Sequence, residues 1–280
     1  MKHYVVTGTS TGIGYATAKY LTDKGHKVFG SVRKAEDGER VKSELGKRFI
    51  PLVFDVVDRA SIDAAVSKVQ MELGENGLAG LVNNAGIAVS GPLLEVDADD
   101  LRFQFEVNVV GLIQVTQAFA RLLGAYKNCP YPPGKIINIS SVAGKVAPPF
   151  MGPYVASKHA VEGISHSLRR ELMLYGIDVV IVAPGAVKTP IWDKESSVDL
   201  SKYEGSDYQE SGTRFQKFFV KTGKEGLEPE KLGELIYSIF LNKNPKTRYV
   251  ISPAIWKEYR IPRMMSDRRF DKMLKKNLRM

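Results

Sequence analysis

The chain has 280 residues, of which 44% are hydrophobic and 25% charged, a composition typical of a globular protein with a buried core. A single cysteine, Cys129, excludes a disulfide framework, and the four histidines lack a zinc-binding spacing, so we expect no metal site. The net charge is +9, and residues 256–280 contribute +6 of it through nine basic and three acidic side chains. Because the other 255 residues carry only +3, we expect no nucleic-acid partner.

Short β-rich runs alternate with longer helical patterns along most of the chain. Strands are expected at 3–7, 27–32, 49–54, 80–83, 135–140, 178–183 and 248–252, and helices at 14–24, 60–73, 99–123, 154–175 and 232–242. Most of the strands are continuous apolar runs, which is typical of parallel strands covered on both faces. The alternation predicts an α/β fold, a doubly wound parallel sheet with helices on both faces. Since no flexible linker divides the pattern, residues 1–255 are expected to form one domain.

Two segments depart from this alternation before the last helix. Residues 126–134 form a turn-rich loop to which the sequence assigns no role. Residues 190–229 are polar and poorly periodic, so we expect a long loop that covers a substrate pocket.

The basic segment 256–280 forms a C-terminal extension. Ser266 precedes an expected helix with its apolar residues on one face and its cations on the other. Such a helix packs on the protein or on a second subunit, or residues 263–280 lie on an anionic membrane surface. The short segment before the first strand and the lack of a long apolar stretch predict a cytoplasmic protein with at most peripheral membrane association.

A glycine-rich turn follows the first strand, with the spacing Gly8-x-x-x-Gly12-x-Gly14. Gly8 permits a tight turn, Gly12 permits a phosphate to approach the backbone, and Gly14 permits close packing of helix and strand. The following helix offers free N–H groups to a pyrophosphate. The alternative is a turn that merely connects strand and helix. Dinucleotide contacts are expected from Gly8, Ser10, Thr11, Gly12, Ile13 and Gly14.

The residues after the second strand indicate which dinucleotide is bound. NAD is usually held by an acidic side chain at this position, but the sequence has Arg33 and Lys34 there. Two cations suit the additional 2′-phosphate of NADP, so we expect NADP(H) to be preferred over NAD(H). The alternative is that both are ordinary solvated surface cations.

A tyrosine, a lysine and a serine form the candidate catalytic group. Tyr154 and Lys158 are four residues apart in an expected helix and therefore share a face. A neighbouring ammonium stabilises a phenolate, which makes Tyr154 usable as a general acid or base. Ser141 lies at the end of a strand, where its hydroxyl can hydrogen-bond a substrate carbonyl oxygen. A Tyr-x-x-x-Lys pair alone often lies on a solvated helix face, but the glycine turn and the serine argue against that interpretation.

Together these motifs resemble the short-chain dehydrogenase/reductase (SDR) family over about residues 3–190, in particular its steroid and retinol dehydrogenase-like branch. The resemblance implies a Rossmann-type fold and a catalytic tetrad of Asn108, Ser141, Tyr154 and Lys158. It further implies that Asn108 positions a proton-relay water where its helix opens, and that Lys158 and Tyr154 contact the nicotinamide ribose. Additional cofactor contacts implied by the resemblance come from Asp55, Val56, Asn83, Ala85, Gly86, Pro184, Gly185, Val187 and Thr189.

The resemblance also implies an oxidoreductase that interconverts a carbonyl and an alcohol, assembled as a homodimer or homotetramer through the helices 99–123 and 154–175. The residues expected around the substrate are mostly apolar, which favours a lipophilic ketone, aldehyde or alcohol of steroid, retinoid or medium-chain type. They are Ile87, Val89, Ala143, Val146, residues 148–151, Ile191, Trp192, Phe215, Phe218 and Phe219.

Two other functions stay open at this point. One is a reductase of 3-oxoacyl groups on a carrier protein, since a basic surface attracts an acidic carrier. The other is a non-enzymatic NADP-binding sensor or scaffold, which would keep the glycine turn. Such a sensor has no need of Asn108, Ser141, Tyr154 and Lys158 together, so their joint presence disfavours it.

Overall fold

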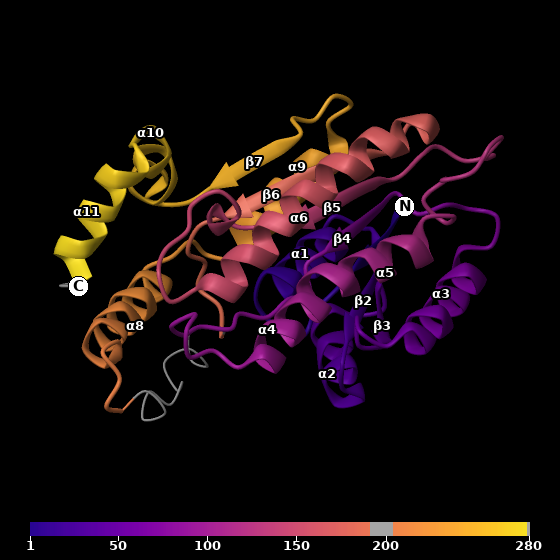
Figure 1. The fold of residues 1–280 in the computed structure, drawn as a ribbon. Helices are drawn as coiled ribbons and strands as arrows, with labels where there is room; N and C mark the ends of the chain where they lie inside the picture. Colours follow the sequence, from indigo (N-terminus) through magenta and orange to yellow (C-terminus); the bar gives the residue numbers. More distant parts are fainter. Residues whose placement is uncertain (191–203, 279–280) are drawn as a thin grey trace.

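The computed structural model describes residues 1–190 and 204–278. Its centre is a seven-stranded sheet in the order β3-β2-β1-β4-β5-β6-β7, in which all neighbouring strands are parallel (Figure 1). The doubly wound sheet is confirmed, and each strand ends within one residue of its predicted limit. The strands are β1 (His3–Val6), β2 (Lys27–Val32), β3 (Phe49–Val53), β4 (Gly80–Asn83), β5 (Lys135–Ile139), β6 (Asp178–Pro184) and β7 (Arg248–Ile251).

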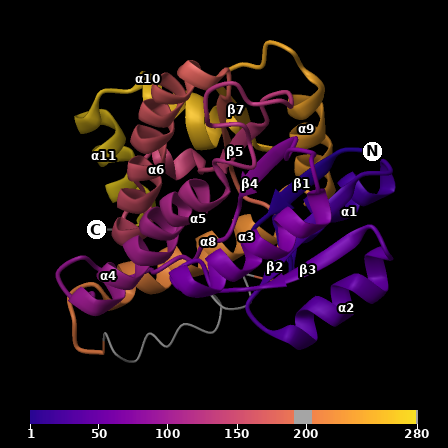
Figure 2. The same cartoon turned by 90° about the vertical axis from the view of Figure 1, so that its right-hand side faces the viewer.

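Helices cover both faces of the sheet (Figures 1 and 2). Side chains alternate along a strand, so Tyr4 and Val6 of β1 enter one apolar core while Val5 enters the other. The helices of the first core are α1 (Gly12–Asp23), α2 (Ala35–Leu45) and α9 (Glu230–Leu241). Those of the second are α3 (Arg59–Leu73), α5 (Gly111–Phe119) and α6 (Gly152–Glu171), which a 3-10 turn at Leu172–Tyr175 extends.

Two helices differ from the sequence prediction. The sequence does not predict α2, which buries little more than Val41 and is otherwise polar. The single helix predicted at 99–123 is wrong, because α4 (Ala98–Phe105) and α5 are separated by a π-helical turn at Glu106–Val110. This turn opens the helix at Asn108, as the family resemblance implies, and such turns often mark functional positions.

The long loop predicted at 190–229 is wrong for its second half, which contains α8 (Gln209–Lys224). This helix buries a narrow apolar stripe and is polar elsewhere, so its period is weak in the sequence. The ring of Phe215 lies 5.4 Å from that of Phe150, just before α6, so α8 packs beside the start of that helix. Ile191 and Trp192, which the sequence places at the substrate, lie outside the described residues.

The C-terminal extension packs on the rest of the protein. It forms a π-helical turn (Trp256–Arg260), α10 (Ile261–Met264) and α11 (Asp267–Leu278), with Ser266 directly before α11. Arg214 Nε of α8 donates a hydrogen bond to the carbonyl of Leu278 at 2.9 Å, and Leu278 is buried in one cluster with Phe215. The C-terminal end of α11 therefore contacts α8 of its own chain.

The turn-rich loop at 126–134 packs at the end of the sheet where β5 begins. Tyr131 donates a hydrogen bond to the carbonyl of Arg121 at 2.8 Å, and the Arg121 guanidinium lies 4.5 Å from the centroid of the Tyr126 ring. A side chain at Gly77 would overlap the Tyr131 ring, so the loop is tightly packed. Ligands of such sheets bind at the opposite, carboxyl ends of the strands, so the loop supports the fold rather than the site.

Candidate active site

The glycine turn lies between β1 and β4, where the strand order reverses and a doubly wound sheet leaves a crevice for a dinucleotide. Gly8 and Gly12 have φ angles of 70° and 61°, in the left-handed region that glycine occupies readily. A Cβ at Gly14 would lie 2.1 Å from the carbonyl oxygen of Gly8, so α1 starts directly on the turn. The three glycines thus leave backbone N–H groups uncovered by side chains at the N-terminus of α1, an arrangement that fits a pyrophosphate.

Hydrogen bonds from two neighbouring strands fix this turn. Ser31 Oγ, in β2, accepts from the Gly8 N–H at 2.9 Å. Asn84 Nδ2, after β4, donates to the carbonyls of Thr7 and Gly8 at 2.9 and 3.1 Å. Neither Ser31 nor Asn84 is among the predicted contacts. Asn84 stands between Asn83 and Ala85, two of the predicted contacts, and this position is the signal that could have identified it.

The predicted contacts of the motif 83–86 divide into two groups. Asn83 is buried, and its Nδ2 donates at 2.9 Å to Thr116 Oγ1 and Asn138 Oδ1, so its side chain faces the core rather than the crevice. The Ala85 N–H donates to Thr7 Oγ1 at 2.9 Å, and Gly86 is exposed beside the Asn108 amide. Ala85 and Gly86 therefore lie beside the glycine turn and Asn108, whereas the Asn83 side chain packs within the sheet.

Three basic side chains gather near the end of β2. Arg33 and Lys34 are exposed there. Arg40 of α2 donates hydrogen bonds to the carbonyl of Ser10 at 2.7 Å and to the Asp37 carboxylate at 3.1 Å. Arg40 is absent from the predicted contacts because α2 is not predicted. Its position relative to Arg33 becomes meaningful only once α2, which begins at Ala35, is known.

The remaining predicted contacts of this half lie at the start of α1 and after β3. Thr11 is exposed directly before α1, and Ile13 is half-buried in its first turn. Asp55 is half-buried after β3, and its Oδ1 accepts from the Val57 N–H at 3.2 Å. Val56 is buried beneath α5. The Asp55 carboxylate is thus held by its own turn at the edge of the sheet.

Tyr154 and Lys158 lie one turn apart on α6, with the Lys158 Nζ 5.6 Å from the centroid of the Tyr154 ring. Lys158 is only 6% exposed, and its ammonium donates to the carbonyl of Ile139, the last residue of β5, at 2.9 Å. Burial lowers the pKa of Lys158 to about 8. A buried amine with a lowered pKa beside a phenol is typical of a site that transfers protons near neutral pH.

Asn108 joins the segment after β4 to α6. Its Oδ1 accepts from the Ile87 N–H at 2.9 Å, and its Nδ2 donates to the Ile87 carbonyl at 3.0 Å and to Ser157 Oγ at 3.1 Å. Ser157 in turn donates to the carbonyl of Tyr154 at 2.8 Å. Asn108 therefore fixes the turn of α6 that carries Tyr154, through a serine that the sequence reasoning missed.

Ser141 follows β5, and its Oγ donates a hydrogen bond to the carbonyl of Pro184 at 3.4 Å. The motif 184–189 then runs toward the glycine turn, where a Cβ at Gly12 would lie 3.0 Å from Thr189 Cγ2. Gly185 and Val187 lie between these two contacts. The structure thus brings Ser141, the motif 184–189 and the glycine turn together at one edge of the sheet.

A buried ion pair lies behind Ser141. Glu162 of α6 is 1% exposed, and its carboxylate accepts hydrogen bonds from Ser140 Oγ at 2.9 Å and from Arg248 Nε at 3.0 Å. Arg248 Nη1 donates to the Tyr259 hydroxyl at 2.9 Å. The pair joins the strand that carries the serine to β7 and to the C-terminal segment. Sequence reasoning could not find it, because 86 residues separate its two members.

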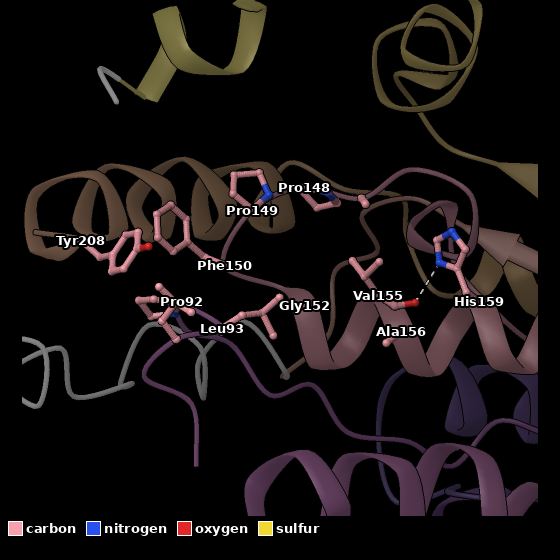
Figure 3. A pocket seen from close by; sticks show the side chains of 12 residues that line it. Pro92, Leu93, Pro148, Pro149, Phe150, Gly152, Val155, Ala156, His159 and Tyr208 are labelled. Atoms are coloured by element: carbon pink, nitrogen blue, oxygen red, sulfur yellow. Dashed lines mark hydrogen bonds between the residues drawn. The ribbon is translucent and has the colours of Figure 1, made fainter. Parts of the chain in front are cut away.

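Apolar side chains surround the substrate side of Tyr154. They form a cluster in which Tyr154 packs. A cavity of about 450 Å³ borders this cluster, because Phe150, Val155 and Tyr208 belong to both, and proline and leucine side chains line the rest of it (Figure 3). Phe150 has a φ of 63°, rare for an aromatic residue and typical of a constrained functional position. The cluster consists of Ala88, Ala143, Phe150, Met151, Tyr154, Val155, Tyr208, Phe215, Phe219 and Leu278.

The predicted lid aromatics separate into two groups. Phe215 and Phe219 belong to the cluster and stack with their ring centroids 5.3 Å apart. Phe218 is 52% exposed on the outer side of α8, which places it outside the cluster.

Lys145 and Lys188 lie near carboxylates, with N···O distances of 3.8 Å to Glu162 and 2.5 Å to Glu228.

Within residues 1–190 and 204–278, no three His, Cys, Asp or Glu side chains are grouped to hold a metal ion. In the same ranges, no helix combines the length and apolar composition that a membrane span requires.

Known proteins are similar to this chain in sequence and in fold. The family described as short chain dehydrogenase matches residues 2–199. An NADPH-dependent 3-dehydrocapnine reductase from Ornithobacterium rhinotracheale is 44% identical over 99% of this chain and 98% of its own length. A 3-ketodihydrosphingosine reductase from Bacteroides thetaiotaomicron is 34% identical over 90% of this chain and 88% of its own.

More distant relatives extend the comparison. The 17-beta-hydroxysteroid dehydrogenase type 6 of Rattus norvegicus is 33% identical over 89% of this chain and 80% of its own, in line with the predicted branch. The crystal structure of a short-chain dehydrogenase/reductase from Burkholderia phymatum in complex with NAD superimposes with a TM-score of 0.79 at 26% identity, covering 98% of this chain and 95% of that one. The chain therefore belongs to the short-chain dehydrogenase/reductase family, whose members are nicotinamide-dependent oxidoreductases, and acts on a CH–OH or C=O group.

Proposed function

We propose that this protein is an NADPH-dependent reductase that converts the 3-keto group of a long-chain lipid base to an alcohol. The observation that carries the proposal is the 44% identity to a 3-dehydrocapnine reductase, which spans 99% of this chain. The similarity thus includes α8 and the C-terminal helices around the substrate side, not the nucleotide-binding half alone. A second relative, at 34% identity, is likewise named for the reduction of a 3-keto compound.

The chain's own residues supply the acid, the cation and the hydroxyl for such a reduction. Bound NADPH would provide the hydride for the carbonyl carbon. Tyr154 donates its phenolic proton to the carbonyl oxygen, and Ser141 hydrogen-bonds that oxygen. Lys158, buried beside the Tyr154 ring, stabilises the phenolate that remains. Asn108 holds this turn of α6 in place through Ser157 and, by resemblance, orients the water that returns the proton.

The preference for NADPH over NADH rests on the cations near the glycine turn. Arg33 and Lys34 are exposed where the second strand ends, and Arg40 reaches the carbonyl of Ser10 at 2.7 Å. Guanidinium groups form strong charge-assisted hydrogen bonds with phosphate, so these three side chains suit a 2′-phosphate. We expect Arg33→Ser to weaken NADPH binding about tenfold and NADH binding about twofold at most, in fluorescence titrations.

The apolar surroundings of Tyr154 support the substrate class. The cluster and the adjoining cavity of about 450 Å³ present prolines, leucines and aromatic rings, which suit an alkyl chain. Phe150, Val155 and Tyr208 belong to both, so the cavity, whose lining also includes His159, adjoins the cluster that contains Tyr154.

A direct comparison of substrates tests the proposal. The purified protein is assayed with 3-ketodihydrosphingosine, a steroid ketone, retinal and a 3-oxoacyl carrier protein, each with NADPH and with NADH. We expect the highest kcat/KM for the long-chain 3-keto base with NADPH. Equal or faster turnover of the steroid, retinal or carrier-bound substrate would overturn the substrate class, and faster turnover with NADH would overturn the cofactor preference.

We further propose a homodimer or homotetramer built on α4, α5 and α6. Leu101 and Phe103 of α4 and Val110 of the π-helical turn are exposed apolar side chains that a second subunit would cover. Light scattering after size exclusion should give a dimer or tetramer that Phe103→Glu weakens. A monomer at micromolar concentration would refute this assembly.

A further inference from the structure

The C-terminal helices and α8 share an exposed apolar surface. Phe218 of α8 is 52% exposed, and Trp256, Ile261 and Met264 are 56%, 46% and 78% exposed. The last three lie in one continuous helical run, the π-helical turn followed by α10, at spacings of five and three residues. Lys257 joins the two parts of the surface, because its Nζ lies 5.6 Å from the centroid of the Phe218 ring. We refer to these four apolar residues as the Trp256 patch.

Cations border the Trp256 patch. The Arg260 guanidinium lies 4.6 Å from the centroid of the Trp256 ring, and Arg263 lies against Tyr259. On α8, Lys217 and Lys221 flank Phe218 and are exposed. Long basic side chains of this kind keep their charge at a polar surface while their stems lie along apolar groups.

The one acidic residue of the π-helical turn, Glu258, is turned away from this surface. Glu258 is half-buried, and its carboxylate accepts a hydrogen bond from Ser252 Oγ at 2.5 Å. A Cβ at Gly185 would meet the same carboxylate, so Glu258 points toward the site rather than toward solvent. The surface of the π-helical turn and α10 is therefore apolar and positive.

One residue of the Trp256 patch, Phe218, lies on the outer side of α8, the helix that packs on the cluster around Tyr154. Phe215 and Phe219 on the inner side of α8 pack in the cluster that includes Tyr154, whereas Phe218 faces outward. In Figure 1, α8, α10 and α11 lie together at the left end of the molecule, toward which the arrowhead of β7 points. The patch and the substrate cluster therefore belong to the same end of the protein.

We infer that the Trp256 patch docks this protein on an anionic membrane surface. The aromatic and aliphatic side chains enter the interfacial region, while Lys257, Arg260 and Arg263 pair with lipid phosphates. Charge complementarity favours this occupant over a second copy of the chain, because a symmetric contact would bring the same cations together. The inference extends the proposed function, since a lipid base that partitions into the bilayer would then meet the substrate side of the enzyme.

Vesicle binding tests the inference without any enzyme assay. The chain has two tryptophans, so the Trp192→Phe variant reports on Trp256 alone. The protein is sedimented with phosphatidylcholine vesicles and with vesicles that contain roughly 30% phosphatidylglycerol. We expect binding to the anionic vesicles that weakens with salt, together with a blue shift of the Trp256 emission and its quenching by brominated acyl chains.

Matched variants assign the contact to the patch. Met264→Ser and Arg260→Glu should each weaken binding to the anionic vesicles at least about fivefold. Met71 is also 78% exposed, but it lies on α3 at the other end of the sheet, so Met71→Ser should leave vesicle binding unchanged (Figure 1). Reduction of a water-soluble short-chain ketone should be unaffected by Met264→Ser, which separates a failure of docking from a failure of the proposed function.

Four results would overturn the inference. Equal binding to neutral and anionic vesicles would contradict the charge argument, and so would the absence of binding to either. Vesicle binding with unchanged Trp256 emission would place the contact elsewhere on the protein. A self-association that Met264→Ser abolishes would assign the patch to a second copy of the chain instead.

Discussion

Replacing Lys158 with methionine tests the electrostatic description of the active site. Burial lowers the pKa of Lys158 from 10.5 to about 8, so the unfolded chain binds this proton more tightly than the folded protein does. Between these two pH values the unfolded state holds more protons, and the stability contributed by this group rises as pH rises. From these two pKa values, the buried charge lowers the free energy of unfolding by about 3 kcal/mol at pH 7 and by about 1 kcal/mol at pH 10.

Methionine is of similar length and has no proton to lose, so the Lys158→Met variant lacks this pH dependence. The unfolding free energy of the variant minus that of the wild-type protein should therefore fall by about 2 kcal/mol between pH 7 and pH 10. Urea unfolding without added cofactor measures both values, and other titrating groups cancel in the difference. A difference that stays constant within about 0.5 kcal/mol would refute the buried, protonated amine. Wild-type turnover should show the opposite trend and decline as pH rises through about 8, because the ammonium beside Tyr154 is lost.

Three further substitutions test separate parts of the site. Tyr154→Phe should reduce reductase turnover at least about 100-fold in steady-state assays, with NADPH affinity nearly unchanged, because only the proton donor is lost; retention of most of the turnover would exclude Tyr154 as the acid. Glu162→Gln disrupts a buried ion pair and should lower the unfolding free energy by about 3 kcal/mol in urea titrations, whereas Glu72→Gln at an exposed pair should cost less than about 1 kcal/mol. Equal losses would contradict the difference in burial. Gly14→Ala places a Cβ 2.1 Å from a backbone oxygen and should weaken NADPH binding at least about tenfold, while Gly163→Ala, with no atom within 4 Å, should not. Unchanged NADPH affinity in Gly14→Ala would mean that the glycine turn does not hold the cofactor.

The sheet could be predicted from the sequence because its signals are local. Each strand is a run of apolar residues bounded by polar or turn residues, and the burial of both faces of a parallel sheet requires that pattern. The glycine turn and the Tyr154–Lys158 spacing are local as well, so neighbouring residues alone were enough to propose them. The helices α2 and α8 carry much weaker signals, because each buries few side chains and presents mostly polar residues to solvent. A lightly buried helix of this kind resembles a polar loop when only hydrophobic periodicity is considered.

Contacts between distant residues account for the parts of the site that sequence reasoning missed. Asn83 and Asn84 are neighbours in the sequence, and only the pairing of β4 with β1 and β5 decides which amide reaches the glycine turn. Asn83 points between the strands and α5, toward Thr116, whereas Asn84 lies past the strand end and donates to Gly8. The sequence also cannot reveal that Arg40 reaches Ser10, since that contact depends on the position of α2.

The basic C-terminal segment shows why charge alone is a poor guide to the role of a sequence. The excess of lysine and arginine does not reveal that three side chains of this segment reach the functional half of the molecule. The Glu258 carboxylate lies against Gly185 of the motif 184–189. The Tyr259 hydroxyl accepts a hydrogen bond from Arg248 of the buried ion pair, and Leu278 packs in the cluster that includes Tyr154. The cations lie on the surface between these inward contacts, as the alternation of a helix requires. The same segment can therefore close the substrate side and present a positive, apolar surface outward, and this combination is what a reductase of membrane-derived substrates would need.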